Sequence, residues 1–119
     1  MTAPSKRALR NFLTLLFSGK LSKAEESLRR LRKRLEDDGY YKALYGIYYA
    51  YISDDRDSYL FQLWRRYMNG AKKEELKKYF KELLKEAYDP PKGFLQAWLD
   101  MIDMIDSLPT PHKIAKGKK

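Results

Sequence analysis

Apolar residues recur at spacings of three and four along most of the chain, which is the pattern of amphipathic helices. The clearest segment lies between Leu21 and Leu35, where Ser22 and Glu25 also form a predicted capping box. No stretch shows the period-two alternation of a half-buried strand. The pattern therefore predicts an all-α protein.

Capping and stop signals divide this pattern into about six amphipathic helices, joined by connections of two to four residues. Such short connections make consecutive helices antiparallel neighbours, so we expect three antiparallel hairpins. The predicted helices cover residues 5–18, 21–35 and 40–52, then run from an Asp54 cap to Asn69-Gly70, from about 72 to 88, and from Asp89-Pro90-Pro91 to Ser107.

The three hairpins start near residues 6, 40 and 73, a spacing of about 34 residues. Gly19 with Ala24 in the first hairpin, and Gly46 with Tyr49 in the second, occupy positions of small and aromatic residues in tetratricopeptide repeats. The third hairpin has none of these, and no hairpin contains the full pattern. The spacing thus resembles that of tetratricopeptide repeats, and two architectures fit: a compact helical bundle or a short tetratricopeptide-like stack.

The length of 119 residues and the 44% hydrophobic content suit one domain with a sizeable core. We expect that domain to span residues 1–108. Residues 109–119 are expected to form a flexible basic tail, because Pro109, Pro111 and Gly117 oppose helix formation there.

The chain has no cysteine, which excludes disulfides and thiol chemistry and suits an intracellular protein. Its longest uncharged run, Ala43–Ser53, is shorter than the about 20 apolar residues that a membrane span requires. We therefore expect a cytoplasmic protein without membrane association. The abundance of Lys, Glu, Arg and Tyr, with few Asn and Gln, is a thermophile-like composition.

The net charge of +9 is concentrated at the two ends of the sequence. Residues 1–24 carry +5 without any acid, residues 25–106 hold 16 basic and 16 acidic residues, and residues 107–119 carry +4. The first 24 residues also fit a targeting presequence, but they lack an A-x-A-like cleavage site and are equally well explained as an amphipathic helix.

Basic segments of this kind bind polyanions by releasing counterions from phosphates, whereas a solubilising terminus is the alternative for the tail. The candidate nucleic-acid-binding residues are the basic side chains of the two ends and two pairs between them: Lys6, Arg7, Arg10, Lys20, Lys23, Lys33, Arg34, Arg65, Arg66, Lys113, Lys116, Lys118 and Lys119.

Two clusters allow more than one interpretation. The basic run 29–34 is either a phosphate-binding stripe or a solvated face, because acidic residues at 25–26 and 36–38 lie one helical turn away. The tyrosines between Tyr40 and Tyr51 favour the central helix of a bundle, with Gly46 admitting a close neighbour. The alternative is an exposed platform on which single-stranded bases stack.

The sequence contains no positive signal for catalysis. Asp100, Asp103 and Asp106 follow a spacing of three, which we interpret as a solvated helix face rather than a metal site. His112 is the single histidine and lies in the predicted tail, where it cannot support a preorganised acid–base site. There is no phosphate-binding glycine loop or nucleophile motif, so we expect no enzyme, cofactor or metal.

These observations favour a nucleic-acid-associated accessory protein that binds DNA or RNA phosphates largely without sequence specificity. No recognition helix for reading bases in a duplex stands out. The alternative is a helical protein–protein interaction module or a non-catalytic subunit of a larger complex. An apolar surplus on exposed helix faces would favour that alternative.

Overall fold

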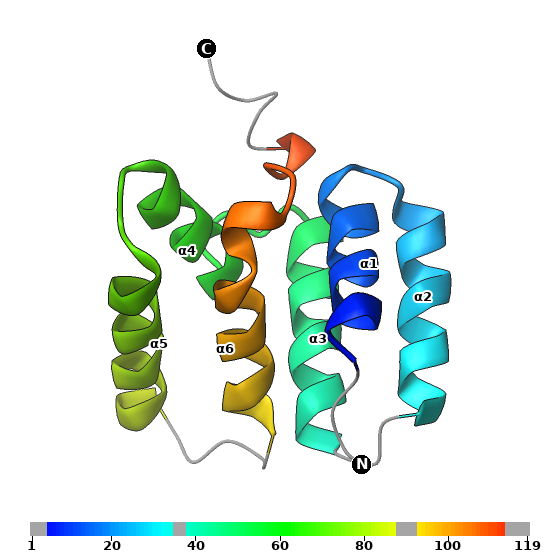
Figure 1. Cartoon of the computed structure of the whole chain (residues 1–119), viewed down its shortest axis with the longest axis horizontal. Coiled ribbons are helices and arrows are strands. Elements are labelled where there is room, and N and C mark those ends of the chain that lie inside the picture. The colour runs from blue at the N-terminus through cyan, green and yellow to red at the C-terminus, as the bar shows by residue number, and fades with distance from the viewer. Residues whose placement is uncertain (1–4, 35–37, 88–92, 114–119) are drawn as a thin grey trace.

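The structure is a computed structural model that describes residues 5–34, 38–87 and 93–113. Within these ranges the chain forms six α-helices and one 3₁₀ helix and no strand, which confirms the predicted all-α class (Figure 1). The helices are α1 (Lys6–Phe17), α2 (Leu21–Arg34), α3 (Asp38–Ile52), α4 (Tyr59–Met68), α5 (Lys73–Ala87) and α6 (Phe94–Asp103), followed by η1 (Ile105–Ser107).

The helices lie in two groups of three, α1–α3 and α4–α6, which meet where α6 packs along α3 (Figure 1). Helix α1 also contacts α6, so the first and third hairpins touch each other. In a tetratricopeptide-like stack each repeat contacts only its neighbours. The chain therefore folds as a helical bundle, and its radius of gyration of 13.5 Å matches the value of about 13.5 Å expected for one domain of this length.

Aromatic side chains join the two groups of helices at the centre of the core. The ring of Phe17 on α1 meets the rings of Tyr51 on α3 and Trp64 on α4 edge-on, with both centroid distances 5.5 Å. Tyr51 also stacks on Phe61 of α4 at 5.8 Å. All four side chains are at most 1% exposed, so these contacts fix α4 across the ends of α1 and α3.

Three helices end in the same turn, which has one residue in the left-handed conformation. That residue is Gly19 after α1 (φ +87°), Asp54 after α3 (φ +59°) and Gly70 after α4 (φ +104°). In each turn the following N–H donates to a carbonyl five residues back, at 2.9–3.0 Å. The helix ends predicted at Gly19 and at Asn69-Gly70 are thus confirmed.

Two predicted helix starts are wrong. Asp54 lies in the turn that ends α3 and does not cap the fourth helix. The N-cap of α4 is Ser58, whose Oγ accepts from the Phe61 N–H at 3.5 Å. Helix α2 already begins at Leu21, so Ser22 lies inside its first turn and cannot be the cap of the predicted capping box. The predicted restart at residues 89–91 lies outside the described residues.

The end of the described chain packs against the bundle, where the sequence predicts a free tail. Pro111 is buried, and the Nδ1 atom of His112 lies 2.6 Å from the hydroxyl of Tyr51. The backbone N–H of Lys113 donates to that hydroxyl at 3.2 Å, and its ammonium group donates to the carbonyls of Tyr51 and Ile52 at the end of α3. We call residues 111–113 the C-terminal latch.

Candidate nucleic-acid interface

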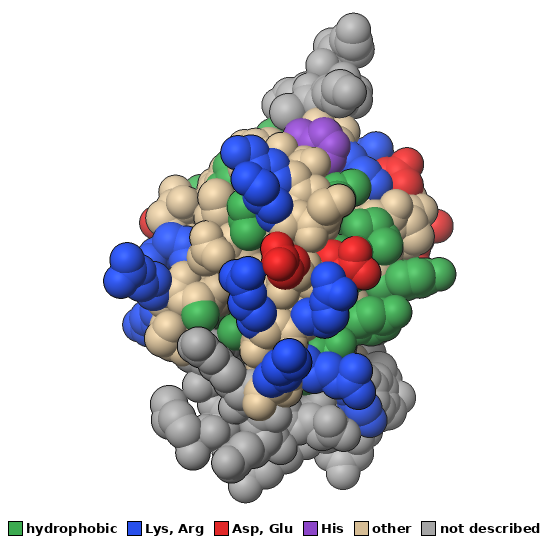
Figure 2. Space-filling view, turned by 90° about the vertical axis from the view of Figure 1, so that its right-hand side faces the viewer, with side chains coloured by type: hydrophobic (Ala, Val, Ile, Leu, Met, Phe, Trp, Pro, Cys, Tyr) green, Lys and Arg blue, Asp and Glu red, His purple; other side chains and the backbone are tan. Residues whose placement is uncertain are grey.

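The α1–α2 hairpin carries most of the excess positive charge. Residues 1–34 contain ten basic and two acidic residues, whereas residues 35–119 contain fifteen and fourteen. Figure 2 shows this side of the molecule, where Lys and Arg side chains are spread widely and acidic side chains are few. Nine exposed side chains form what we call the basic hairpin surface: Lys6, Arg7, Arg10, Lys20, Lys23, Arg29, Arg30, Arg32 and Lys33.

Helical periodicity places these cations on the outside of the hairpin. Ala24, Leu28 and Leu31 of α2 are buried against the core, so the basic residues between them face solvent. Within the described part of the hairpin the single ion pair joins Arg30 to Glu26 at 3.4 Å, and both side chains are more than half exposed. An exposed pair of this kind contributes little to stability, and most of the surface stays uncompensated.

Of the local ion pairs expected for the basic run 29–34, the described residues show the one between Arg30 and Glu26. Arg29 and Lys33 form no ion pair with any residue that the structure describes, and the guanidinium of Arg32 lies 5.5 Å from the ring centroid of Tyr41. The predicted acidic partners at 36–38, and the side chain of Arg34, lie outside the described side chains.

Helix α3 combines a buried side with an exposed tyrosine face. Its buried side chains include Tyr40, Leu44 and Tyr51, as expected for a central helix. On its opposite side Tyr45 and Tyr49 are 47% and 57% exposed. Helix α3 is therefore a central helix on one side and exposes tyrosines on the other.

We call Tyr41, Tyr45 and Tyr49 the tyrosine ladder. These residues are four apart and so lie on one face of α3. The ring centroids are 6.2 Å apart between Tyr41 and Tyr45 and 6.3 Å apart between Tyr45 and Tyr49. Gly46 lies on the exposed side of this helix, and a Cβ added there would meet no atom within 4 Å. The expected close neighbour at Gly46 is therefore not present among the described residues.

The tyrosine ladder and the basic hairpin surface adjoin along α2 and α3. Arg32 of α2 lies over the ring of Tyr41, and the charges of Glu25 and Arg29 of α2 interact electrostatically with Tyr48. Burial, and secondly the charge of Glu25, raises the pKa of Tyr48, whereas Arg29 opposes this shift. Figure 2 shows hydrophobic side chains gathered along one edge of this view, beside Lys and Arg.

Arg65 and Arg66 are exposed, as expected, but they lie on α4 in the other group of helices (Figure 1). The guanidinium of Arg66 lies 3.7 Å from the ring centroid of Tyr79, whose hydroxyl donates to Gln62 at 2.8 Å. The fold therefore does not join these two candidates to the basic hairpin surface.

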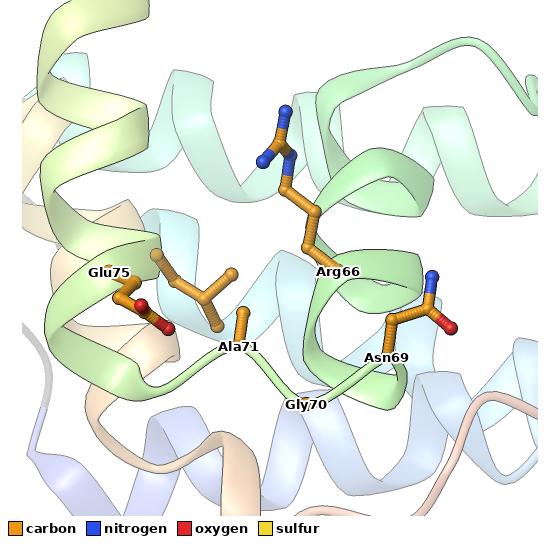
Figure 3. Close-up of a pocket in the computed structure, with 6 residues that line it drawn as sticks. Arg66, Asn69, Gly70, Ala71 and Glu75 are labelled. Carbon is orange, nitrogen blue, oxygen red and sulfur yellow. The ribbon is translucent and has the colours of Figure 1, made fainter.

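A hollow of about 540 Å³ lies beside Arg66, between α4 and α5. Figure 3 shows Glu75 of α5 on its opposite side and the linker residues Gly70 and Ala71 along its edge. A carboxylate oxygen of Glu75 accepts from the backbone N–H of Lys72 at 2.7 Å, so this acid holds the start of α5. A hollow with one cation and a nearby carboxylate that already holds a helix start is poorly suited to bind an anion.

The remaining basic candidates lie near the C-terminus of the sequence. The ammonium group of Lys113 donates to α3 carbonyls and is therefore engaged within the protein. Lys116, Lys118 and Lys119 lie outside the described residues.

The three aspartates of the sixth helix and its extension are engaged in separate contacts. Asp100 accepts from the Tyr40 hydroxyl and from Gln96, both at 2.7 Å. Asp103 pairs with Lys77 of α5, and Asp106 with Lys73 at 3.2 Å. They do not converge, and the described part of the chain contains no group of side chains that could hold a metal ion.

Comparisons with known proteins give no match, whether with family models, curated proteins or solved structures. None of the helices in the described ranges combines the length and the apolar character needed to cross a membrane.

Proposed function

We propose that this protein binds DNA or RNA phosphates, largely without sequence specificity, through the basic hairpin surface. One observation carries the proposal: nine exposed cations share two packed helices with two acids, Glu25 and Glu26, while the rest of the chain is close to neutral.

Like charges at this density repel one another, so as a group they disfavour the compact fold of the hairpin. On a polyanion the same charges displace condensed counterions, which gives affinity without reading the base sequence. The packing of α1 on α2 also fixes the backbone positions of these side chains relative to one another. The proposal therefore moves the main contacts from the chain ends to the hairpin.

The test is a salt titration of binding to duplex DNA. If about five phosphates are contacted, the log–log slope of affinity against salt is about −4 to −5. The variant K6Q/R7Q/R10Q should flatten that slope by up to about 3. The matched control removes three exposed lysines from α5 (K78Q/K81Q/K85Q) and should leave the slope nearly unchanged. Absence of binding at low salt, or equal effects of both variants, would reject the proposal.

A specific observation also supports the alternative of a protein-interaction module. The exposed side of α3 carries Tyr45, Tyr49 and Ile52, beside an apolar groove of about 360 Å³ that reaches Tyr59 and Trp98. An apolar surplus of this kind favours partner binding. This second candidate predicts a complex with an acidic protein that survives high salt, together with no nucleic-acid affinity at low salt.

A further inference from the structure

We propose that the tyrosine ladder makes this protein prefer single-stranded nucleic acid: bases stack on Tyr45 and Tyr49 while Arg29 and Arg32 contact the adjoining phosphates. The inference rests on the proposed function and names its substrate class. Single strands present both phosphates and open base faces, whereas a duplex hides its base faces within the stack.

The rings are both accessible and held in place. Tyr45 lies between Tyr41 and Tyr49 on the helix and also contacts Tyr48, with ring centroids 6.2–6.4 Å apart. The Tyr45 and Tyr49 rings lie within 17° of parallel. Rings ordered before binding lose little conformational freedom when a base stacks on them.

Gly46 provides room beside these rings. It follows Tyr45 directly, lies on the exposed side of α3, and has open space where a Cβ would stand. Glycine costs about 0.5–1 kcal/mol relative to alanine within a helix, and no close packing in the described structure explains its use here. A base can therefore approach the ladder closely along the helix backbone.

The surrounding charge distinguishes a polyanion from an apolar protein surface as the occupant. Arg29 and Arg32 are exposed on α2 beside the ladder, and Lys42 is exposed on α3 next to Tyr41. The two arginines place the phosphates along α2, with the bases over Tyr45 and Tyr49.

The test compares binding of the full chain to a single-stranded oligothymidine and to a DNA duplex of the same length at one salt concentration. The wild-type protein should bind the single strand more tightly. The variant Y45L/Y49L should lose at least about tenfold in single-strand affinity, because stacking of bases on tyrosine rings contributes to that affinity. Its duplex affinity should stay unchanged, because paired bases cannot stack on the rings. The matched variant Y45F/Y49F keeps the rings and should retain single-strand binding.

The outcomes separate this inference from the function on which it rests. Equal affinity for both probes, or no effect of Y45L/Y49L, overturns the role of the ladder while leaving phosphate binding by the hairpin intact. A uniform loss for both probes in K6Q/R7Q/R10Q, without loss of preference, supports the division of roles. If neither probe binds, both proposals fail. If Y45L/Y49L instead disrupts self-association of the chain, the ladder is a protein interface and the inference is wrong.

Discussion

Removing the C-terminal latch should destabilise the bundle, although the sequence predicts a tail that is dispensable for folding. We compare a chain that ends at Lys113 with one that ends at Leu108. The first keeps the contacts of Tyr51 with His112 and Lys113, and the second loses all of them. Both chains lack the same segment beyond Lys113, so their difference reports on residues 109–113.

The magnitude follows from the hydroxyl of Tyr51, a side chain with 0% exposure. Without the latch its remaining partner is the Phe17 carbonyl at 3.5 Å, the limit of a hydrogen bond. Loss of its hydrogen bonds to His112 and Lys113 costs about 0.5–1.5 kcal/mol each, and loss of the Lys113 cation at the end of α3 adds about 0.3–1 kcal/mol. The chain ending at Leu108 should therefore be less stable by about 2 kcal/mol, which lowers its Tm by roughly 8 °C.

Tyr51→Phe in both chains makes the test specific. In the chain ending at Lys113 the substitution should cost about 1 kcal/mol, because it breaks the bonds to the latch. In the chain ending at Leu108 it should be neutral, because the hydroxyl has already lost those partners. Urea unfolding followed by circular dichroism measures all four stabilities. A truncation cost below about 0.5 kcal/mol, or equal costs of Tyr51→Phe in the two chains, would refute the reasoning.

Two further predictions concern backbone conformation and proton linkage. Gly46 and Gly70 both have open space at the Cβ position, but only Gly70 has a positive φ (+104°). Gly46→Ala should therefore stabilise the fold by about 0.5–1 kcal/mol, and Gly70→Ala should destabilise it by about 1 kcal/mol. Stability changes of the same sign for the two variants in urea unfolding would contradict this. Burial, and then the hydrogen bond and charge of Asp100, raises the pKa of Tyr40. Above pH about 10 the unfolded chain releases this proton before the folded chain does, so stability should fall by up to about 1.4 kcal/mol per pH unit, and Tyr40→Phe should remove that component of unfolding curves at alkaline pH.

The helices could be predicted because their apolar spacing and stop residues agree. Helix α5 spans Lys73–Ala87, within one residue of the predicted 72–88. The caps were harder, since one residue type serves two purposes: aspartate favours helix starts and also tolerates the left-handed conformation. At Asp54 the second property wins, because Ser58 is available to cap α4 and Asp54 can close α3.

The candidate site could be predicted only in part. From the sequence, the basic candidates of the hairpin include Lys20, Lys23 and Lys33 of its second half. Arg29, Arg30 and Arg32 are not among them, because an acid one helical turn away offers each a local ion pair. Spacing shows that Arg29 and Arg32 lie off the leucine seam, but not that α3 packs on their side. The exposed tyrosines had no distinct signal, because tyrosine suits both a buried core and a wet surface.

Lysine and arginine side chains form ion pairs between helices in one half of the bundle but not in the described part of the other. This contrast supports a binding role of the hairpin most strongly. On α5, Lys73 and Lys77 pair with Asp106 and Asp103 across the helix interface, so these cations help to join α5 to the end of the chain. The basic hairpin surface contains the local pair of Arg30 with Glu26 and no pair across helices within the described residues. A general bias toward charged residues would supply both halves with acids alike. Among the described residues the imbalance lies in the hairpin that borders the exposed tyrosines, which is the arrangement expected where phosphate is the missing counterion.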